Sequence, residues 1–237
     1  MIRRRGRGAR IARMRSSLVA LLAALSLQAA AAPFTASVGP ERVVLDAIPG
    51  MSDALPLGSP RLIELAESIA SPSDRILLFA LTDLDLRRFQ QGDRIDLRRY
   101  LLLVTPKSLE RERVGPEPFR ALVADLRRDI GKPTQPGDLR QALEGQPEGR
   151  TVALQLLKDT DRVYSIMAGS RLPGAGGGGW FSRPSSQYVL STSTALTLRD
   201  KAFTLTVNTL FESSQDAEWL RLATERWVEV LQKLNAR

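Results

Sequence analysis

The stretch YVLSTSTALTLRDKAFTLTVNTLF, residues 188–211, decides the fold of this chain. Its two halves, Tyr188–Leu198 and Ala202–Phe211, are typical of strands, and Arg199-Asp200 between them predicts a hairpin turn. In the second half the apolar side chains fall on one side of the strand and the polar ones on the other. These two sets are Phe203, Leu205, Val207 and Phe211, against Thr204, Thr206 and Asn208. We therefore expect a hairpin with one buried face and one more polar face.

A long amphipathic helix is expected directly after this hairpin. Ser213-Ser214-Gln215-Asp216 has the capping residue and the acidic first turn with which helices begin. Apolar residues then recur at helical spacing. They are Trp219, Leu220, Ala223, Trp227, Val230, Leu231 and Leu234. Burying the two indole rings contributes several kcal/mol at ~25 cal/mol per Å², so this helix should hold the sheet in place.

Capping residues and apolar runs predict the upstream elements. One helix is expected from Ser59-Pro60 to Ser71-Pro72. A second is expected from Glu117-Pro118 to Gly131. The expected strands are Arg42–Ala47, Arg75–Thr82, Tyr100–Thr105, Thr151–Leu157 and Arg162–Ala168, with one helical turn at Asp138–Leu143. Strands that are adjacent in sequence and covered by helices predict an α+β fold, a mostly antiparallel β-sheet in a sandwich architecture.

Composition divides the chain into three parts. Residues 1–32 hold seven arginines, then the apolar run Leu18–Leu27 and a group of small residues, which is the pattern of a secretory signal peptide. We expect cleavage near Ala30–Ala32. The alternative is an uncleaved N-terminal anchor, although the apolar run is short against the span of about 20 residues that a membrane requires. Residues 33–58 form an N-terminal extended segment, and residues 59–237 a single α+β domain.

The net charge of +8 belongs mainly to the first 32 residues. Without their seven arginines the chain has 27 basic and 26 acidic side chains, which are interspersed along the sequence. A protein that binds nucleic acid irrespective of sequence needs a basic face. Nucleic acid is therefore not an expected partner, and we expect a soluble protein of the periplasm or the exterior.

The composition also narrows the possible chemistry. The chain has no cysteine and no histidine, so it forms no disulfide and lacks the imidazole base, the Ser-His-Asp arrangement and the usual zinc ligands. Carboxylate pairs, a Ser-Lys dyad or an oxygen-ligand metal site remain. Lys107 and Ser108 are neighbours, but adjacent strand positions point to opposite faces. We expect no cofactor, no metal and no catalytic residue.

The ending of the chain carries a resemblance. Residues 188–211, followed by SSQDAEWLRLATERWVEVLQKL at residues 213–234, resemble the hairpin and helix that end uncharacterised secreted bacterial proteins. The layout is similar to the PsbP-like α/β/α sandwich. Such domains are mostly non-catalytic binding or assembly modules, so the resemblance implies a fold and no catalytic residues.

A glycine-rich loop at residues 173–186 has the spacing G-x-G-x-x-G at Gly174, Gly176 and Gly179. In a dinucleotide site this pattern opens a helix whose N-terminal amides meet the phosphates. A strand is expected after the loop in this chain. We therefore interpret the loop as a flexible connection between two hairpins.

The tip of this loop is a candidate binding element. Trp180 and Phe181, with Arg183 close by, would be presented where little regular structure can bury them. An envelope protein or a membrane surface would suit such a tip. The alternative is that the two rings fold back onto the core.

The tetrapeptide DLRR occurs three times, and its arginines are a second candidate site. Arg87 and Arg88 precede a turn expected at Gln90-Gln91-Gly92-Asp93, and Arg98 and Arg99 follow it. Guanidinium groups match carboxylate and phosphate, so the four arginines could bind an anion. A solvated surface of ion pairs is the alternative.

Two pairs of aspartates are the remaining candidates. Asp83 and Asp85 could face the same side near a strand end, and so could Asp159 and Asp161. Paired carboxylates can share a proton or bind calcium, although neither pair has the full calcium-loop pattern. Surface charge and turn formation are the alternatives.

Two functions follow from these residues. The first is an exported, soluble binding or assembly module without catalysis. The second is a carboxylate-dependent, hydrolase-like enzyme of the cell envelope that uses Asp83 and Asp85. The enzyme requires a concave pocket into which both carboxylates converge, and the binding module requires an exposed patch.

Overall fold

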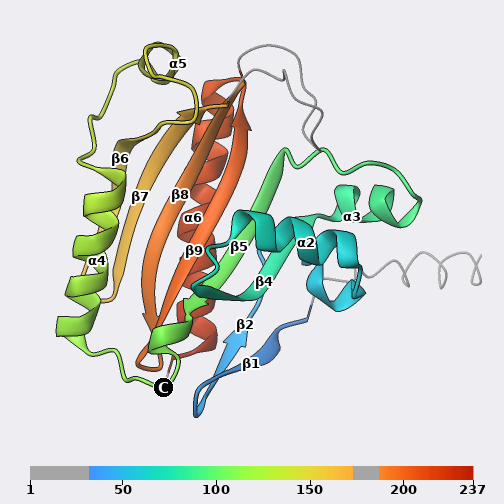
Figure 1. The fold of residues 1–237 in the computed structure, drawn as a ribbon, viewed down its shortest axis with the longest axis vertical. Coiled ribbons are helices and arrows are strands. Elements are labelled where there is room, and N and C mark those ends of the chain that lie inside the picture. The colour runs from blue at the N-terminus through green and yellow to red at the C-terminus, as the bar shows by residue number, and fades with distance from the viewer. Residues whose placement is uncertain (1–31, 173–186, 237) are drawn as a thin grey trace, which may run out of the picture. The chain divides into compact units, whose positions relative to one another are not determined.

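A seven-stranded sheet runs through the centre of the domain (Figure 1). The computed structural model describes residues 32–172 and 187–236, and the chain from Pro33 onward forms one compact unit. All neighbouring strands of this sheet are antiparallel, so the expected α+β fold is confirmed. The strands lie in the order β3 (Met51–Asp53), β4 (Asp74–Thr82), β5 (Arg99–Pro106), β9 (Lys201–Phe211), β8 (Tyr188–Leu198), β7 (Val163–Arg171) and β6 (Thr151–Asp159).

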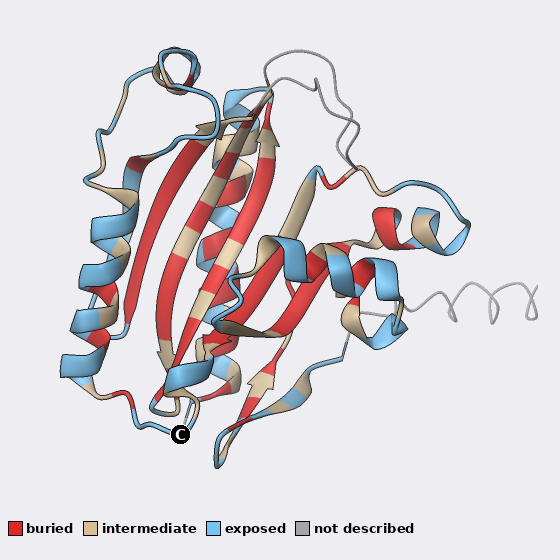
Figure 2. Cartoon of the chain, in the orientation of Figure 1, coloured by how far each residue is buried: buried red, intermediate tan, exposed pale blue. Residues whose placement is uncertain are grey.

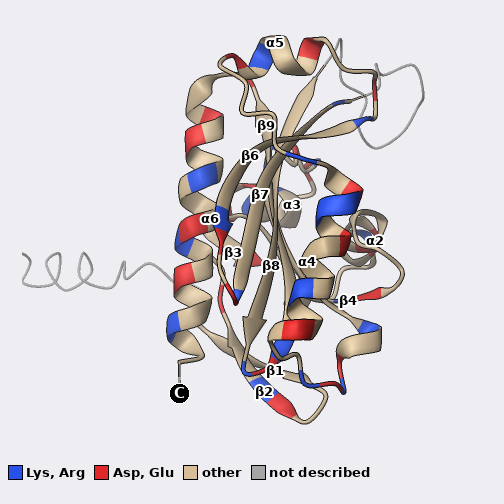
Figure 3. Cartoon of the chain, turned by 90° about the vertical axis from the view of Figure 1, so that its left-hand side faces the viewer, with Lys and Arg blue, Asp and Glu red and all other residues tan. Residues whose placement is uncertain are grey.

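Helices cover both faces of the sheet (Figures 1 and 3). The long helix α6 (Ser214–Leu234) lies on one face, which we call the back face. Helices α2 (Pro60–Ile69) and α4 (Pro116–Ile130) lie on the other, the front face. Shorter elements are α3 (Asp83–Gln90), α5 (Leu139–Glu144) and the 3-10 turns η1 (Leu55–Leu57) and η2 (Lys107–Leu109). Within residues 32–172 and 187–236, no helix is long and apolar enough to cross a membrane.

The β8–β9 hairpin has the predicted form. Arg199 and Asp200 both have positive φ angles, 49° and 59°, the left-handed geometry of the type I′ turn that suits the twist of paired strands. On the back face Phe203, Leu205 and Val207 are fully buried. The predicted division into a buried and a more polar face is therefore confirmed.

The back face holds the largest part of the core. Leu220, Trp227 and Leu231 of α6 pack against the buried residues of β8 and β9. The Trp227 side chain is fully buried, and its Nε1 donates to the carbonyl oxygen of Asp46 at 2.8 Å. The terminal helix therefore clamps the sheet, as expected.

A separate two-stranded sheet packs beside α6. It consists of β1 (Phe34–Val38) and β2 (Glu41–Leu45), which pair antiparallel. Val38, Val43 and Leu45 are fully buried in the back-face core. The sequence predicts only one strand within residues 33–58, whereas the structure has β1, β2 and β3. Strand β3 was missed because three residues are too few to show a period, and β1 forms a strand through its pairing with β2.

Two smaller apolar clusters pack on the front face. Helices α2 and α3 cover β4 and β5 through Leu62, Ala66 and Leu86. Helix α4 covers β6, β7 and the lower part of β8 through Phe119 and Val123. Among the described residues, no helix lies in front of the upper part of β8 and β9 (Figure 1). Figure 2 shows that buried and half-buried residues alternate along these strands.

Candidate functional site

The loop at residues 173–186 lies outside the described part of the chain. This applies to the glycine pattern at Gly174, Gly176 and Gly179 and to the candidate binding residues Trp180, Phe181 and Arg183. The binding role of these residues stays a prediction, and the site is built below from described residues only.

The four candidate arginines lie on two different elements. Arg87 and Arg88 are in the last turn of α3, where the Nε of Arg87 donates to the carbonyl oxygen of Asp83 at 3.2 Å. Arg98 and Arg99 lie at the beginning of β5. A shared anion-binding surface of the four arginines stays a prediction. The contacts that the structure shows for Arg98 and Arg99 are with other residues of this chain.

Arg98 and Arg99 pair with acids near the start of α6. Arg98 Nη2 lies 2.6 Å from Glu212 Oε2, and Arg99 Nη2 lies 3.1 Å from Asp216 Oδ1. The Arg99 guanidinium also lies over the Trp219 ring, 4.2 Å from its centre. Burial alone would raise the pKa of Asp216, but backbone amides and Arg99 bind the carboxylate and hold its pKa below the usual value. Arg99 therefore contacts α6 directly, whereas Arg98 forms an exposed ion pair with Glu212, which precedes the helix.

Asp83 and Asp85 belong to a helix rather than to a strand end. They occupy the first turn of α3, which the sequence did not predict, and residues two apart in a helix do not share a side. Thr82 caps the helix: its Oγ1 accepts from the Asp85 amide at 3.0 Å and donates to Asp85 Oδ2 at 2.6 Å. Asp83 Oδ1 accepts from the hydroxyl of Ser52 at 2.7 Å. The expectation that the two carboxylates face one side was wrong.

Asp159 and Asp161 also have separate surroundings. Asp159, at the end of β6, accepts a hydrogen bond from Arg127 Nη2 at 2.6 Å. Asp161 lines a cavity of about 640 Å³ together with Arg162, Arg199 and Asp200, so charges of both signs face that space. Among the described residues, no group of three or more acidic side chains is placed to hold a metal ion.

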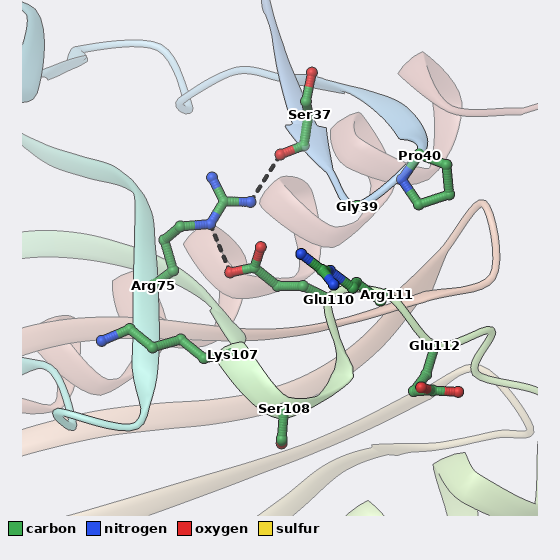
Figure 4. Close-up of a pocket in the computed structure, with 9 residues that line it drawn as sticks. All are labelled: Ser37, Gly39, Pro40, Arg75, Lys107, Ser108, Glu110, Arg111 and Glu112. Atoms are coloured by element: carbon green, nitrogen blue, oxygen red, sulfur yellow. Dashed lines mark hydrogen bonds and ion pairs between the residues drawn. The ribbon is translucent and has the colours of Figure 1, made fainter.

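A larger cavity of about 990 Å³ lies between the β1–β2 turn and the segment after β5 (Figure 4). Arg75 joins its two walls: Nε donates to Glu110 Oε1 and Nη2 to the carbonyl oxygen of Ser37, both at 2.7 Å. Lys107 Nζ donates to the carbonyl oxygen of Pro72 at 2.7 Å. Arg75 and Lys107, which line this cavity, therefore each join two segments of the chain.

Lys201 binds the segment after η2, which also lines this cavity. The residue is only 1% exposed, and its Nζ donates to the carbonyl oxygens of Glu110 at 2.9 Å and Glu112 at 2.6 Å. These two bonds fasten the segment after η2 to the beginning of β9. Satisfying a buried ammonium in this way makes Lys201 a structural residue.

The strongest candidate site is a row of polar side chains on the front face, which we call the polar strip. Strand register places its members side by side on β8 and β9, and its four hydroxyl residues are half-buried. The members are Ser191, Ser193, Thr204, Thr206 and Asn208. The apolar clusters of the front face lie on either side of the strip.

Asn208 is the member that distinguishes the polar strip from an ordinary solvated face. The residue is only 6% exposed, and its buried Nδ2 has no hydrogen-bond partner among the described residues. Asn235, also 6% exposed, shows the usual arrangement: Nδ2 donates to the carbonyl oxygens of Val44 and Leu231, and Oδ1 accepts from the Val44 amide. Because buried polar groups are almost always paired, the donor of Asn208 needs an explanation.

Tyr100 borders the polar strip and adds no charge to it. It lies directly across from Asn208 on β5, and burial raises the pKa of its hydroxyl to about 12. The phenol is therefore neutral at physiological pH. No member of the polar strip is ionisable, so this part of the front face carries hydrogen-bonding groups without charge.

The sequence alone indicates only the residues of the polar strip that lie on β9. Alternation in β9 places Thr204, Thr206 and Asn208 on the polar side. The serines of β8 join them only through the hairpin register, which pairs Ser191 with Asn208 and Ser193 with Thr206. Nothing in the sequence shows that the Asn208 donor lacks a partner.

Comparison with solved structures finds chains of similar structure. The chain is similar to the Ran-binding protein Mog1p of Saccharomyces cerevisiae, with 14% sequence identity, covering 87% of this chain and 94% of that one, at a TM-score of 0.32. No family model matches the chain, and no curated protein matches it.

Proposed function

We propose that this protein is an exported binding module that holds a component of the cell envelope on its polar strip. One observation carries the proposal. Asn208 is buried with a free Nδ2 donor, beside a row of half-buried hydroxyls that no described helix covers. An unpaired buried donor weakens the fold by about 1–3 kcal/mol, and departures of this kind are typical of functional sites.

The surroundings of the acidic residues support binding rather than hydrolysis. Asp83 and Asp85 hold the N-terminus of α3, and Asp159 pairs with Arg127. Each of these carboxylates therefore has a structural partner in the chain. The proposed module works by hydrogen bonding and shape, and not by transferring a proton.

We infer that residues 1–32 direct the chain out of the cytoplasm. This proposal is supported by the seven arginines within residues 3–15, which are followed by the apolar run Leu18–Leu27 and by small residues. The resemblance of residues 188–234 to secreted bacterial proteins of PsbP-like layout also supports this proposal. The periplasm or the exterior would then be where the polar strip meets its ligand.

Export is tested by fractionating cells that produce the full chain and sequencing the N-terminus of the protein. We expect a periplasmic or secreted product that begins between residues 31 and 33, because signal peptidases cleave after small residues. A cytoplasmic product that retains Met1 would contradict the export proposal. The polar strip is tested separately, because it does not depend on the route.

The binding role is tested by immobilising the chain from Pro33 onward and exposing it to cell-envelope extract. Ser193→Arg places a long cation in the middle of the polar strip, and we expect at least tenfold less of a retained envelope component. The matched control is Leu222→Arg on the outer side of α6, where the side chain is 49% exposed. Equal retention by the two variants and the wild type would show that the polar strip is not the binding surface.

A further inference from the structure

The cavity of about 640 Å³ lies at the end of the sheet where α4 begins and α6 ends, and we call it the end cavity (Figure 1). Two turns bring charged residues to it. Asp161 and Arg162 follow β6, and Arg199 and Asp200 join β8 to β9. Cavities of ~300–1,000 Å³ are typical of small-molecule sites, so the end cavity is large enough for a small ligand.

The charges around the end cavity are not used to join segments of the chain by ion pairs. Within residues 32–172 and 187–236, the side chains of Asp161, Arg162 and Asp200 have no hydrogen-bond or ion-pair partner. Arg199 has one, since its Nη1 donates to the carbonyl oxygen of Arg42 at 3.1 Å. Asp161, Arg162 and Asp200 are exposed, so their charged atoms are accessible to a ligand.

The rest of the lining adds apolar surface and two helix ends. Pro116 and Ala236 are exposed and line the cavity with their carbon atoms. Pro116 is the first residue of α4, whereas Gln232 belongs to the last turn of α6. The amino end of a helix is partially positive and the carboxyl end partially negative. Both signs of helix dipole therefore meet at the end cavity, as both signs of side chain do.

This arrangement favours a ligand that is charged but has no net charge. Two arginines and two aspartates line the cavity, so their charges sum to zero. A simple anion would be repelled by Asp161 and Asp200, and a simple cation by the two arginines. A molecule that carries a carboxylate and an ammonium group together satisfies both sets, because each group meets its opposite charge.

We propose that the end cavity binds a small zwitterion, an α-amino acid or a dipeptide with an apolar side chain. The Arg162 guanidinium donates to the carboxylate of the ligand, the pairing that its planar fork suits best. Asp161 and Asp200 accept from the ammonium group. The apolar side chain packs on Pro116 and Ala236. This site goes beyond the proposed binding function, because it uses other residues and another class of ligand than the polar strip does.

The first experiment titrates ¹⁵N-labelled chain from Pro33 onward with L-leucine and, separately, with L-alanyl-L-leucine. We expect at least one of these zwitterions, at millimolar concentration, to shift the backbone amide resonances at residues 161–162 and 197–200. The amides of Ser191 and Thr206 in the polar strip should not move. The tighter of the two ligands shows whether the cavity takes a free amino acid or a dipeptide.

Two comparison probes test whether both charges of the ligand are needed. N-acetyl-L-leucine keeps the carboxylate and lacks the ammonium group, and L-leucinamide keeps the ammonium group and lacks the carboxylate. We expect each to bind about tenfold or more weakly than the zwitterion, because each loses its charge-assisted hydrogen bonds on one side. These probes are used on the wild-type chain, so the result does not depend on a variant that must fold.

Two variants with matched controls locate the site. We expect Arg162→Gln and Asp161→Asn each to weaken binding of the zwitterion by about tenfold or more, with an unchanged thermal midpoint because neither side chain has a partner in the described chain. The controls are Arg150→Gln, just before β6 at the opposite end of that strand, and Asp129→Asn, in the last turn of α4. Both control residues are exposed, and their substitution should leave the affinity unchanged.

Three results would overturn the inference. The first is that neither zwitterion shifts the resonances around the end cavity. The second is that N-acetyl-L-leucine or L-leucinamide binds as tightly as the zwitterion, which would make the ligand a simple anion or a simple cation. The third is that Arg162→Gln and Asp161→Asn both bind as the wild type does, which would place the ligand elsewhere. None of these results bears on the polar strip, which the Ser193→Arg capture experiment decides.

Discussion

Replacing Trp227 with alanine is expected to lower the free energy of unfolding by about 4 kcal/mol, the usual range for a large aromatic truncation in a core being 3–5 kcal/mol. The ring is fully buried between α6 and the sheet. The change also removes the bond from Nε1 to Asp46, which leaves that carbonyl oxygen without its partner. Chemical unfolding followed by circular dichroism measures the loss without relying on tryptophan fluorescence.

Trp219→Ala is the matched control for this prediction. Trp219 is in the same helix but is only half-buried, and one side of its ring lies under Arg99. We expect a loss of about 1–2 kcal/mol, from partial burial and the cation–π contact. A loss at Trp227 no larger than that at Trp219 would mean that burial of the Trp227 ring is not what anchors α6 to the sheet.

Gly39→Ala is expected to lower the free energy of unfolding by about 3 kcal/mol. Gly39 has a φ of +57°, and a methyl group there would lie closer than 3.0 Å to the backbone of Glu110. The left-handed conformation alone costs about 1–2 kcal/mol in a residue with a side chain. The clash adds to this cost because the backbone carbonyl of Glu110 must move, and that carbonyl accepts a hydrogen bond from the buried ammonium of Lys201.

Gly58→Ala isolates the clash from the backbone conformation. Gly58 has a similar φ of +63°, and nothing lies within 4 Å of the position of the added methyl group. We expect a loss of about 1 kcal/mol for this variant, measured by the same unfolding experiment. Equal losses in the two variants would show that the contact between the β1–β2 turn and the segment after β5 is unimportant for stability.

The hairpin and the terminal helix could be predicted from sequence because their signals are local. Alternation over eleven residues defines β9, and a capped apolar stripe defines α6. The front-face helices α2 and α4 were likewise marked by a proline in the first turn. Each of these four elements is long enough for its periodicity to be recognised in its own sequence.

The misses occurred where partners from elsewhere in the chain decide the structure. Strand β3 has three residues and exists through pairing with β4. Helix α3 begins directly after the expected end of β4 at Thr82, where the missed spacing of Thr82 and Asp85 forms a cap and Ser52 of β3 binds Asp83. Arg98 and Arg99 form ion pairs with residues more than 100 positions away in sequence. Apart from the Thr82 cap, these contacts leave no pattern in the local sequence.

The sequence by itself determined the antiparallel hairpin, its polar and apolar sides and the helix that covers the apolar side, because periodicity and capping act within one segment. Only the tertiary structure decided which part of the polar side is covered by the described helices. Helix α4 covers β6, β7 and the lower part of β8, and α2 covers β4 and β5. Where helices settle on a sheet depends on contacts between distant segments, and within residues 32–172 and 187–236 those contacts left the buried donor of Asn208 without a partner.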